Sequence, residues 1–163
     1  MMIIRMMGMA AMLLLVAACS NNPPPATTGG GMPNSGMGGP GFAPGSQQDL
    51  AATAGDRVFF AYDQSTISDE GQQILQRQAQ WLQRYPQVRV TIEGHCDERG
   101  TREYNLALGA RRAEAVKHVL IAMGIPAGRV ATISYGKERP IVVGSNEAAW
   151  AQNRVAITTV NGG

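Results

Sequence analysis

The sequence has little of several features that would direct it to common functions. Only two cysteines, Cys19 and Cys96, occur among its 163 residues, and aromatic residues make up only 6%. Lysine and arginine exceed aspartate and glutamate by a formal net charge of only +2. Nucleic-acid-binding proteins usually carry a basic face and aromatic side chains that stack on bases. The composition therefore gives no signal for nucleic-acid binding.

The N-terminal apolar run is too short to cross a bilayer. It extends from Met6 to Ala18, whereas a transmembrane helix needs about 20 residues. With Arg5 before it, the run is typical of a secretory signal peptide. It ends in Val16-Ala17-Ala18-Cys19, small residues before a cysteine as in a bacterial lipobox. We interpret residues 1–18 as a removed signal peptide and Cys19 as the lipidation site; the alternative is an ordinary signal peptide with an incidental cysteine.

The segment after Cys19 resembles a tether. Residues 20–46 are rich in Asn, Pro, Gly and Ser, a composition that cannot bury enough apolar surface to fold. We predict a disordered linker with a root-mean-square reach of about 25–30 Å. If Cys19 carries lipid, Cys96 has no disulfide partner, although the compartment is oxidising. The domain at residues 47–163 must then be stabilised by its core alone.

Periodicity and capping residues predict an alternating order of strands and helices in this domain. Ser68 is a helix N-cap with acids in the following turn, and Pro86 ends that helix near Arg84. Thr101 caps a longer helix that ends before Gly124. The predicted strands cover residues 57–61, 88–93, 129–135 and 154–160, and the predicted helices cover 69–84, 102–123 and 147–152. This order predicts an α+β fold with helices packed on a mixed sheet.

The stretch from Gly94 to Ala113 carries the most specific pattern. It contains Gly94-His95, Asp97-Glu98-Arg99-Gly100-Thr101, Glu103-Tyr104-Asn105, Leu108-Gly109 and Arg111-Arg112-Ala113. With Phe60-Ala61-Tyr62-Asp63 before it and Asn153-Arg154 after it, the sequence resembles the OmpA-like peptidoglycan-binding domain family from about Val58 to Ile157. Val155 stands where that family commonly has a second arginine. The resemblance implies a β-α-β-α-β-(α)-β sandwich with both long helices on one face of the sheet.

Helical spacing separates the two adjacent arginines of this stretch. On a 100° wheel, one sector of the helix forms a core stripe. The stripe consists of Leu106, Gly109, Ala113, Val116, Leu120 and Met123. Arg112 and Asn105 lie together on the edge of the stripe, and Arg111 lies on the opposite side. We therefore expect Arg112 to be partly buried and Arg111 to be exposed.

A partly buried arginine needs an anion or other acceptors, and Asp97 is the nearest candidate. One interpretation is a structural Asp97–Arg112 pair that fixes the loop. The other is an amphoteric pocket in which Arg112 binds a carboxylate and Asp97 an ammonium. The resemblance favours the second, because the matching positions of the family bind meso-diaminopimelate of the peptidoglycan stem peptide. It also implies further lining residues, which are Tyr62, Asp63, Arg99, Thr101, Asn105 and Leu108.

The sequence His95-Cys96-Asp97 suggests an enzyme, but the chemistry argues against one. Adjacent residues leaving a strand point to opposite faces, so His95 and Cys96 cannot form a dyad. A zinc site needs three or four ligands, and beyond its carboxylates the chain offers His95, His118 and Cys96. We expect no enzyme activity, metal or cofactor, and we expect Cys96 to be half-buried beside the pocket.

These features together predict a lipid-anchored protein on the periplasmic face of the outer membrane that binds peptidoglycan. The resemblance further implies a role in the Tol system during cell division and a TolB-like β-propeller protein as partner. One alternative is an OmpA-like module of another envelope system, such as a secretion complex or a motor stator. A stator would carry a transmembrane helix in place of the lipobox. A cell-wall hydrolase is the remaining alternative, and it would need a nucleophile or metal.

Overall fold

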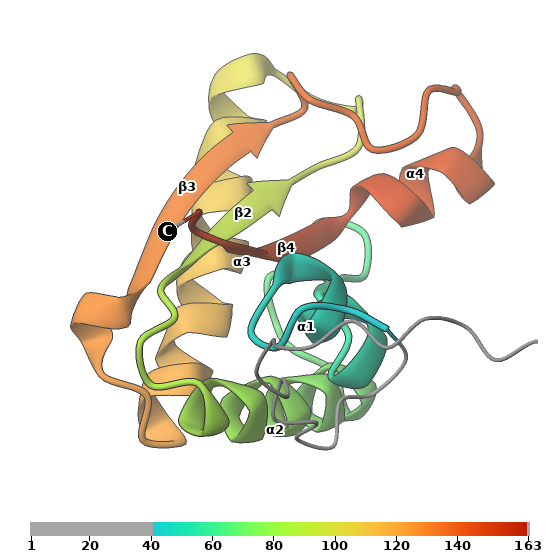
Figure 1. Cartoon of the computed structure of the whole chain (residues 1–163). Coiled ribbons are helices and arrows are strands. Elements are labelled where there is room, and N and C mark those ends of the chain that lie inside the picture. The colour runs from blue at the N-terminus through green and yellow to red at the C-terminus, as the bar shows by residue number, and fades with distance from the viewer. Residues whose placement is uncertain (1–40, 163) are drawn as a thin grey trace, which may run out of the picture. The chain divides into compact units, whose positions relative to one another are not determined.

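The computed structural model describes residues 41–162, in which helices cover one face of a four-stranded sheet (Figure 1). The predicted signal peptide, Cys19 and most of the predicted linker lie outside the described residues. In chain order the elements are α1 (Gln47–Thr53), β1 (Arg57–Phe59), α2 (Asp69–Arg84), β2 (Val90–His95), α3 (Arg102–Ala122), the 3₁₀ turn η1 (Ala127–Arg129), β3 (Val130–Gly136), α4 (Glu147–Asn153) and β4 (Val155–Val160).

The sheet is mixed, with strand order β1-β4-β2-β3. β4 lies antiparallel between β1 and β2, and β3 runs parallel to β2 at one edge. The parallel β2–β3 pair carries the register Val90↔Val130, and the register shifts at His95. The carboxyl ends of both strands therefore lie at the same edge, where the loop after β2 enters α3.

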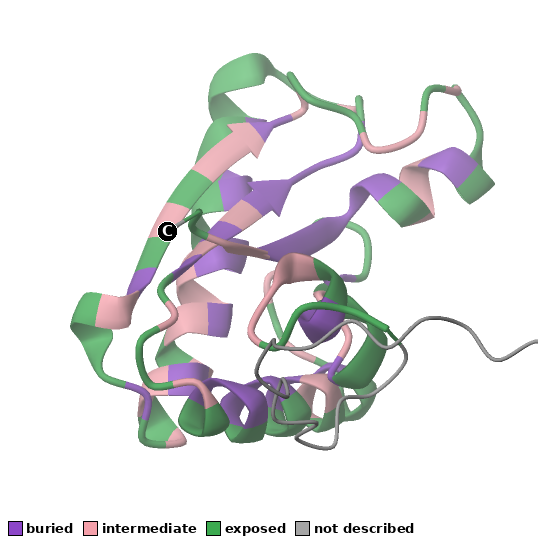
Figure 2. Cartoon of the chain, in the orientation of Figure 1, coloured by how far each residue is buried: buried purple, intermediate pink, exposed green. Residues whose placement is uncertain are grey.

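Both long helices pack on one face of the sheet, as the α+β prediction requires. Gln78 of α2 accepts a hydrogen bond from Thr158 of β4, and Gly109 of α3 contacts Gly94 of β2. The register places Gly94 opposite Ala156, which shares a strand face with Thr158. Buried residues concentrate along this interface (Figure 2). The opposite face leaves Phe59 and Ile133 exposed.

Glycines let α3 approach the sheet closely. A Cβ at Gly94 would lie 1.9 Å from the carbonyl oxygen of Gly109, and a Cβ at Gly109 would lie 2.3 Å from Ser134 Oγ. Gly136, with φ +51°, would place a Cβ 2.9 Å from the backbone nitrogen of Leu106. Backbone-to-backbone packing of this kind fixes the first turns of α3 against the ends of β2 and β3.

Several predicted boundaries and positions need correction. The prediction did not include α1 or η1, β1 ends earlier than predicted, and β2 is displaced toward its carboxyl end. The amide of Ser46 bonds the carbonyl of Ala43, so ordered structure begins slightly before the predicted boundary at Gln47. Leu106 is 41% exposed rather than in the core, because β3 ends at Gly136 beside its backbone. None of the helices within residues 41–162 is long and apolar enough to span a membrane.

Candidate functional site

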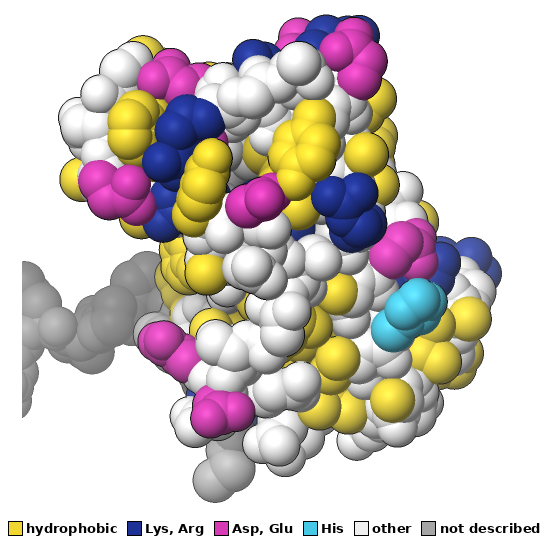
Figure 3. Space-filling model, turned by 180° about the vertical axis from the view of Figure 1, so that it is seen from behind, with side chains coloured by type: hydrophobic (Ala, Val, Ile, Leu, Met, Phe, Trp, Pro, Cys, Tyr) yellow, Lys and Arg dark blue, Asp and Glu magenta, His cyan; other side chains and the backbone are white. Residues whose placement is uncertain are grey.

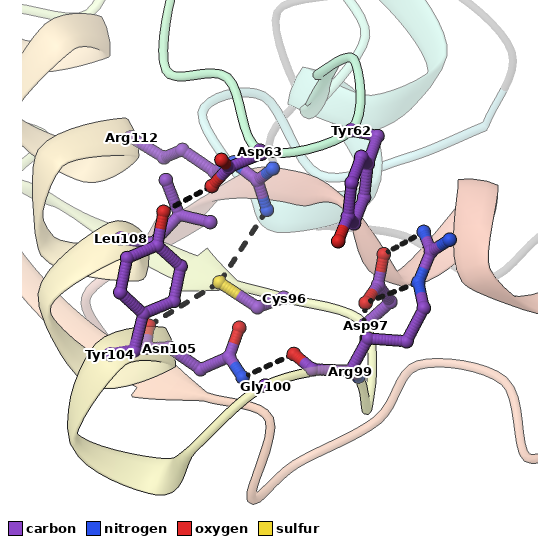
Figure 4. A pocket seen from close by; sticks show the side chains of 10 residues that line it. All are labelled: Tyr62, Asp63, Cys96, Asp97, Arg99, Gly100, Tyr104, Asn105, Leu108 and Arg112. Carbon is purple, nitrogen blue, oxygen red and sulfur yellow. Dashed lines mark hydrogen bonds and ion pairs between the residues drawn. The ribbon is translucent and has the colours of Figure 1, made fainter.

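A pocket of about 90 Å³ lies where the loop after β2, the first turns of α3 and the turn after β1 meet. In the view from behind that of Figure 1, charged side chains gather in the upper part of the molecule with hydrophobic side chains between them (Figure 3). The pocket is lined by Tyr62, Asp63, Cys96, Asp97, Arg99, Gly100, Tyr104, Asn105, Leu108 and Arg112 (Figure 4). Its size suits one end of a small molecule rather than a whole peptide.

Arg112 forms the buried end of the pocket and is 0% exposed. Its Nε donates to the carbonyl of Gln64 at 2.8 Å, its Nη1 to that of His95 at 2.8 Å and its Nη2 to that of Ala61 at 3.2 Å. Within the described chain the guanidinium forms no ion pair with a carboxylate, and burial lowers its pKa from the ordinary value. A guanidinium has five N–H donors. The second N–H of Nη1 donates to Cys96 Sγ at 3.5 Å, so one N–H, on Nη2, is left over.

Asp97 is buried but is paired with two other arginines. Its Oδ1 accepts from the backbone N and the Nε of Arg99, both at 3.1 Å, and its Oδ2 accepts from Arg99 Nη2 at 2.6 Å. Arg154 Nη1 lies 3.5 Å from Oδ2. Burial raises the pKa of Asp97, but the hydrogen bonds and charge of Arg99, together with Arg154, outweigh it and lower the pKa overall. Asp97 is therefore held as an anion.

Asn105 fixes the loop that carries Asp97. Its Nδ2 donates to the carbonyls of Arg99 at 2.7 Å and Thr101 at 3.0 Å. Its amide oxygen is directed toward the middle of the pocket (Figure 4). Gly100 in this loop has φ +90°, a conformation that favours glycine. The side chain of Asn105 thus stabilises the loop and offers an acceptor inside the pocket.

The rim of the pocket is aromatic and acidic. Tyr62 is 60% exposed and Tyr104 is 45% exposed. The hydroxyl of Tyr104 donates to Asp63 Oδ1 (Figure 4), and this hydrogen bond raises the pKa of Tyr104. Asp63 has φ +57°, a left-handed conformation that aspartate tolerates better than most residues. The rim therefore presents one carboxylate and two rings to solvent.

The structure brings together all of the predicted pocket residues except Thr101. Thr101 instead caps α3 by accepting a hydrogen bond from the backbone amide of Tyr104. The interpretation of a structural Asp97–Arg112 pair, which was the less favoured one, is wrong, because Asp97 pairs with Arg99 and Arg154. Arg112 is more deeply buried than predicted, whereas Arg111 is exposed as expected.

Tyr104 and Gly100 line the pocket although the sequence analysis did not assign them to it. Tyr104 lies one helical position before Asn105, on the side of the first turn of α3 that faces away from the core stripe. Its role depends on Asp63, which is far away in the sequence. The signals that could have pointed to them are their places in the motifs that resemble the family and their proximity to Thr101 and Asn105.

Cys96 and His95 lie in separate environments, as the strand geometry predicts. The Cys96 thiol donates to the carbonyl of Asn105 at 3.3 Å; it is buried rather than half-buried, and burial raises its pKa. His95 Nδ1 lies 3.0 Å from the carbonyl of Arg139, and its Nε2 lies 3.6 Å from Glu93. Burial lowers the pKa of His95. Among residues 41–162, no cluster of three or more His, Cys, Asp or Glu side chains is arranged to hold a metal.

Comparison with known proteins gives consistent similarities. The OmpA family pattern matches residues 59–154. A peptidoglycan-associated lipoprotein of Agrobacterium fabrum is 57% identical over 136 residues, which cover 80% of this chain and 77% of the relative. The peptidoglycan-associated lipoprotein of Pasteurella multocida is 50% identical over 112 residues, covering 69% and 74% respectively.

Solved structures show the same architecture. The crystal structure of the peptidoglycan-associated lipoprotein from Burkholderia pseudomallei matches with a TM-score of 0.64 at 44% identity, covering 65% of this chain and 90% of that chain. The C-terminal domain of Helicobacter pylori MotB matches with a TM-score of 0.62 at 23% identity, covering 66% and 85%. The second likeness supports the fold alone.

Proposed function

The chain belongs to the OmpA family, and we propose that it is an outer-membrane lipoprotein whose domain binds peptidoglycan non-covalently. Relatives that cover most of the chain are named peptidoglycan-associated lipoproteins. In this proposal the pocket binds the free amino-acid end of meso-diaminopimelate in the stem peptide. The domain thereby links the outer membrane to the cell wall.

The observation that carries this proposal is the environment of Arg112. A fully buried guanidinium without a carboxylate partner is costly unless an anion completes its surroundings. Three of its N–H groups bond backbone carbonyls, and a fourth, on Nη1, bonds Cys96 Sγ, which is a weak acceptor. The fifth, on Nη2, is available to a ligand, and the one on Nη1 can exchange the sulfur for a ligand oxygen. Two parallel N–H donors match the two oxygens of a carboxylate. Arg112 is therefore prepared to receive the ligand carboxylate at the buried end of the pocket.

The ligand ammonium requires acceptors close to the place where Arg112 binds the ligand carboxylate, because both groups lie on one carbon of the amino acid. Asp97 is an anion that lines the pocket. It accepts three hydrogen bonds from Arg99, and its Oδ2 lies 3.5 Å from Arg154 Nη1, so a ligand ammonium would share this carboxylate with Arg154. Asp63 and the amide oxygen of Asn105 face the same pocket. We assign the ammonium to Asp97 with Asp63 and Asn105 beside it. Leu108 and the Tyr62 ring then contact the aliphatic part of the ligand.

The remaining parts of the proposal concern the whole protein. Cys19 would carry the lipid, and residues 20–46 would allow the domain to reach the wall from the periplasmic face of the outer membrane. Family membership supports a role in the Tol system, with a TolB-like β-propeller protein as a partner. That partner is tested by co-purification from cells that carry an affinity tag on this chain.

A cell-wall hydrolase is the less favoured candidate. Burial keeps Cys96 as a neutral thiol, whereas a cysteine nucleophile must be a thiolate. The nearest polar neighbours of its sulfur are the carbonyl of Asn105 and the guanidinium of Arg112, and neither can act as a general base. The pocket is consequently suited to binding.

The test is sedimentation of the purified domain with isolated sacculi. We expect the domain to pellet with the sacculi, and free meso-diaminopimelate to release it by competition. Cadaverine, which has the same carbon chain and two ammonium groups but no carboxylate, is the matched control ligand and should not release the domain. If the domain pellets but diaminopimelate does not compete, the assigned ligand is wrong; if it does not pellet, wall binding itself is wrong.

A further inference from the structure

One face of the short helix α4 contacts the loop that carries Asp97. None of the residues on this face was assigned to the pocket lining, so these contacts have no role in the proposed site so far. Glu147, Trp150 and Arg154 follow one another at spacings of three and four residues, which places them on one side of the helix. Glu147 bonds Arg154 Nη2 at 2.8 Å and lies 3.9 Å from Arg99 Nη1. Trp150 Nε1 donates to Glu98 Oε1 at 3.0 Å. Each of the three side chains therefore contacts the loop that holds Asp97, including Arg99, the arginine that pairs with Asp97.

Arg99 is the point at which these contacts converge. Its guanidinium carbon lies 4.1 Å from the ring centre of Tyr62 and 4.3 Å from that of Trp150. The same guanidinium holds both oxygens of Asp97. A long side chain that is about one-third exposed normally samples several rotamers. Two aromatic contacts restrict Arg99 to the single rotamer that orients Asp97.

We propose that Trp150 is a positioning residue for the wall-peptide site, which it orders by holding Arg99 against Asp97. This inference rests on the proposed function for its ligand but concerns a residue outside the pocket lining. Trp150 does not contact the ligand in this arrangement. It keeps the Asp97 carboxylate in the orientation in which it lines the pocket and can meet the ligand ammonium. Without that ring, Arg99 moves among rotamers and Asp97 loses its fixed orientation.

The first experiment measures this positioning without any ligand. The Arg99 Nε–H group, hydrogen-bonded to Asp97, should give an NMR signal protected from solvent exchange in the wild-type domain. Trp150→Leu keeps an apolar side chain but removes the π face, and it should remove that protection. Trp150→Phe keeps a ring and should retain most of it. Gln152→Ala, on an exposed position of the same helix, is the control that should change nothing.

The second experiment measures binding of free meso-diaminopimelate by calorimetry. Trp150→Leu should lower the affinity about 3- to 30-fold, the range of a cation–π contact that is partly removed from water. In an Arg99→Ala background the same substitution should change the affinity less than about twofold, because its effect passes through Arg99. An equal loss in both backgrounds would overturn the proposal, as would unchanged Arg99 protection in Trp150→Leu.

The two experiments separate this inference from the proposed function. If Arg99 protection responds to Trp150 as expected but the wild-type domain does not bind diaminopimelate, the positioning stands and the assigned ligand is wrong. If the wild-type domain binds and Trp150→Leu binds equally well, the ligand stands and the positioning role is wrong. Circular dichroism of each variant confirms that the comparison is made between folded proteins.

Discussion

Arg111 and Arg112 are adjacent and chemically identical, yet the structure gives them different surroundings. Arg112 is fully buried at the end of the pocket, and Arg111 is exposed. Replacing Arg112 by Ala should weaken sacculus binding by about 2–5 kcal/mol, at least about tenfold in affinity, because a bidentate contact to a desolvated carboxylate is lost. Arg111→Ala should change binding by less than about 1 kcal/mol. Sedimentation with sacculi measures both variants.

The contacts of Arg112 add a control to that comparison. Arg112→Ala would remove a donor from the buried carbonyl of His95 and from the part-buried carbonyls of Gln64 and Ala61, which also costs stability. Binding must therefore be compared per folded molecule, with folding followed by circular dichroism. Arg112→Lys keeps the charge but lacks the planar fork, and it should not restore binding. Greater damage from Arg111→Ala than from Arg112→Ala would show that the pocket is assigned to the wrong arginine.

Asp97 gives a prediction for the dependence of stability on pH. Its pKa is lowered in the folded protein, so its ionised form stabilises the fold above the pKa of an unfolded aspartate, about 3.9. That contribution is lost as pH falls through the lower pKa of the folded state. The difference in unfolding free energy between wild type and Asp97→Asn should be constant above about pH 5 and should shrink below about pH 4. Urea unfolding at several pH values measures it, and a difference that grows on acidification would contradict the assignment.

At the residue scale, periodicity predicted burial better than it predicted partners. The 100° wheel separated Arg112 from Arg111 because both positions belong to one regular helix. The partners of Arg112 could not be predicted, since the carbonyls of Ala61, Gln64 and His95 come from two distant segments. Backbone carbonyls also leave no mark in a sequence. A search for carboxylate partners therefore selected Asp97, which the structure pairs with Arg99.

At the scale of the elements, caps located the long helices, whereas the short helix α1 was missed although Ser46 caps it. Ser68 and Thr101 accept the predicted hydrogen bonds from Gly71 and Tyr104, and both long helices begin where predicted. The helix α1 has only seven residues, too few to show a periodicity, and it follows a Gly- and Pro-rich segment. Its stability comes from tertiary contacts, including the hydrogen bond from Trp81 to Asp49. Such contacts cannot be read from the local sequence.

The close crossing of α3 and β2 predicts a sharp sensitivity at Gly109. A Cβ there would lie 2.3 Å from Ser134 Oγ and 2.9 Å from the carbonyl oxygen of Gly94. The second neighbour is backbone and cannot rotate away, so Gly109→Ala should lower the free energy of unfolding by about 1–3 kcal/mol or more. Gly128→Ala, where a Cβ meets nothing within 4 Å, should be close to neutral. Denaturant unfolding of both variants measures the difference.

A displacement of α3 by Gly109→Ala should also distort the pocket, because Asn105 and Arg112 lie on this helix on either side of Gly109. Gly109→Ala is therefore expected to weaken diaminopimelate binding as well as stability. A stable Gly109→Ala protein that binds normally would mean that the crossing can widen without moving the site.

At the scale of the whole molecule, the N-terminal end of the domain is fixed to the far end of its chain. Gln47 of α1 donates to the carbonyl of Thr158 and accepts from the amide of Val160. These bonds hold the start of the domain beside β4. The pocket lies instead beyond the carboxyl ends of β1 and β2. The domain can therefore be tethered from its N-terminus while its pocket contacts the wall.

Tethering the domain through its N-terminus requires an anchor in the preceding chain, and we expect that anchor at Cys19. The run ending in Val16-Ala17-Ala18-Cys19 should be cleaved before Cys19, which should carry lipid in the mature protein. Mass spectrometry of the N-terminal peptide should show an acylated Cys19, and the protein should fractionate with the outer membrane. Cys19→Ser should release the protein to the periplasm, where the domain should still bind sacculi with unchanged affinity, since a tether of about 27 residues contributes reach and no contacts. An unmodified N-terminus, or cleavage at another position, would show that the protein is not anchored through Cys19. Loss of sacculus binding in Cys19→Ser would mean that the anchor also supports the binding site.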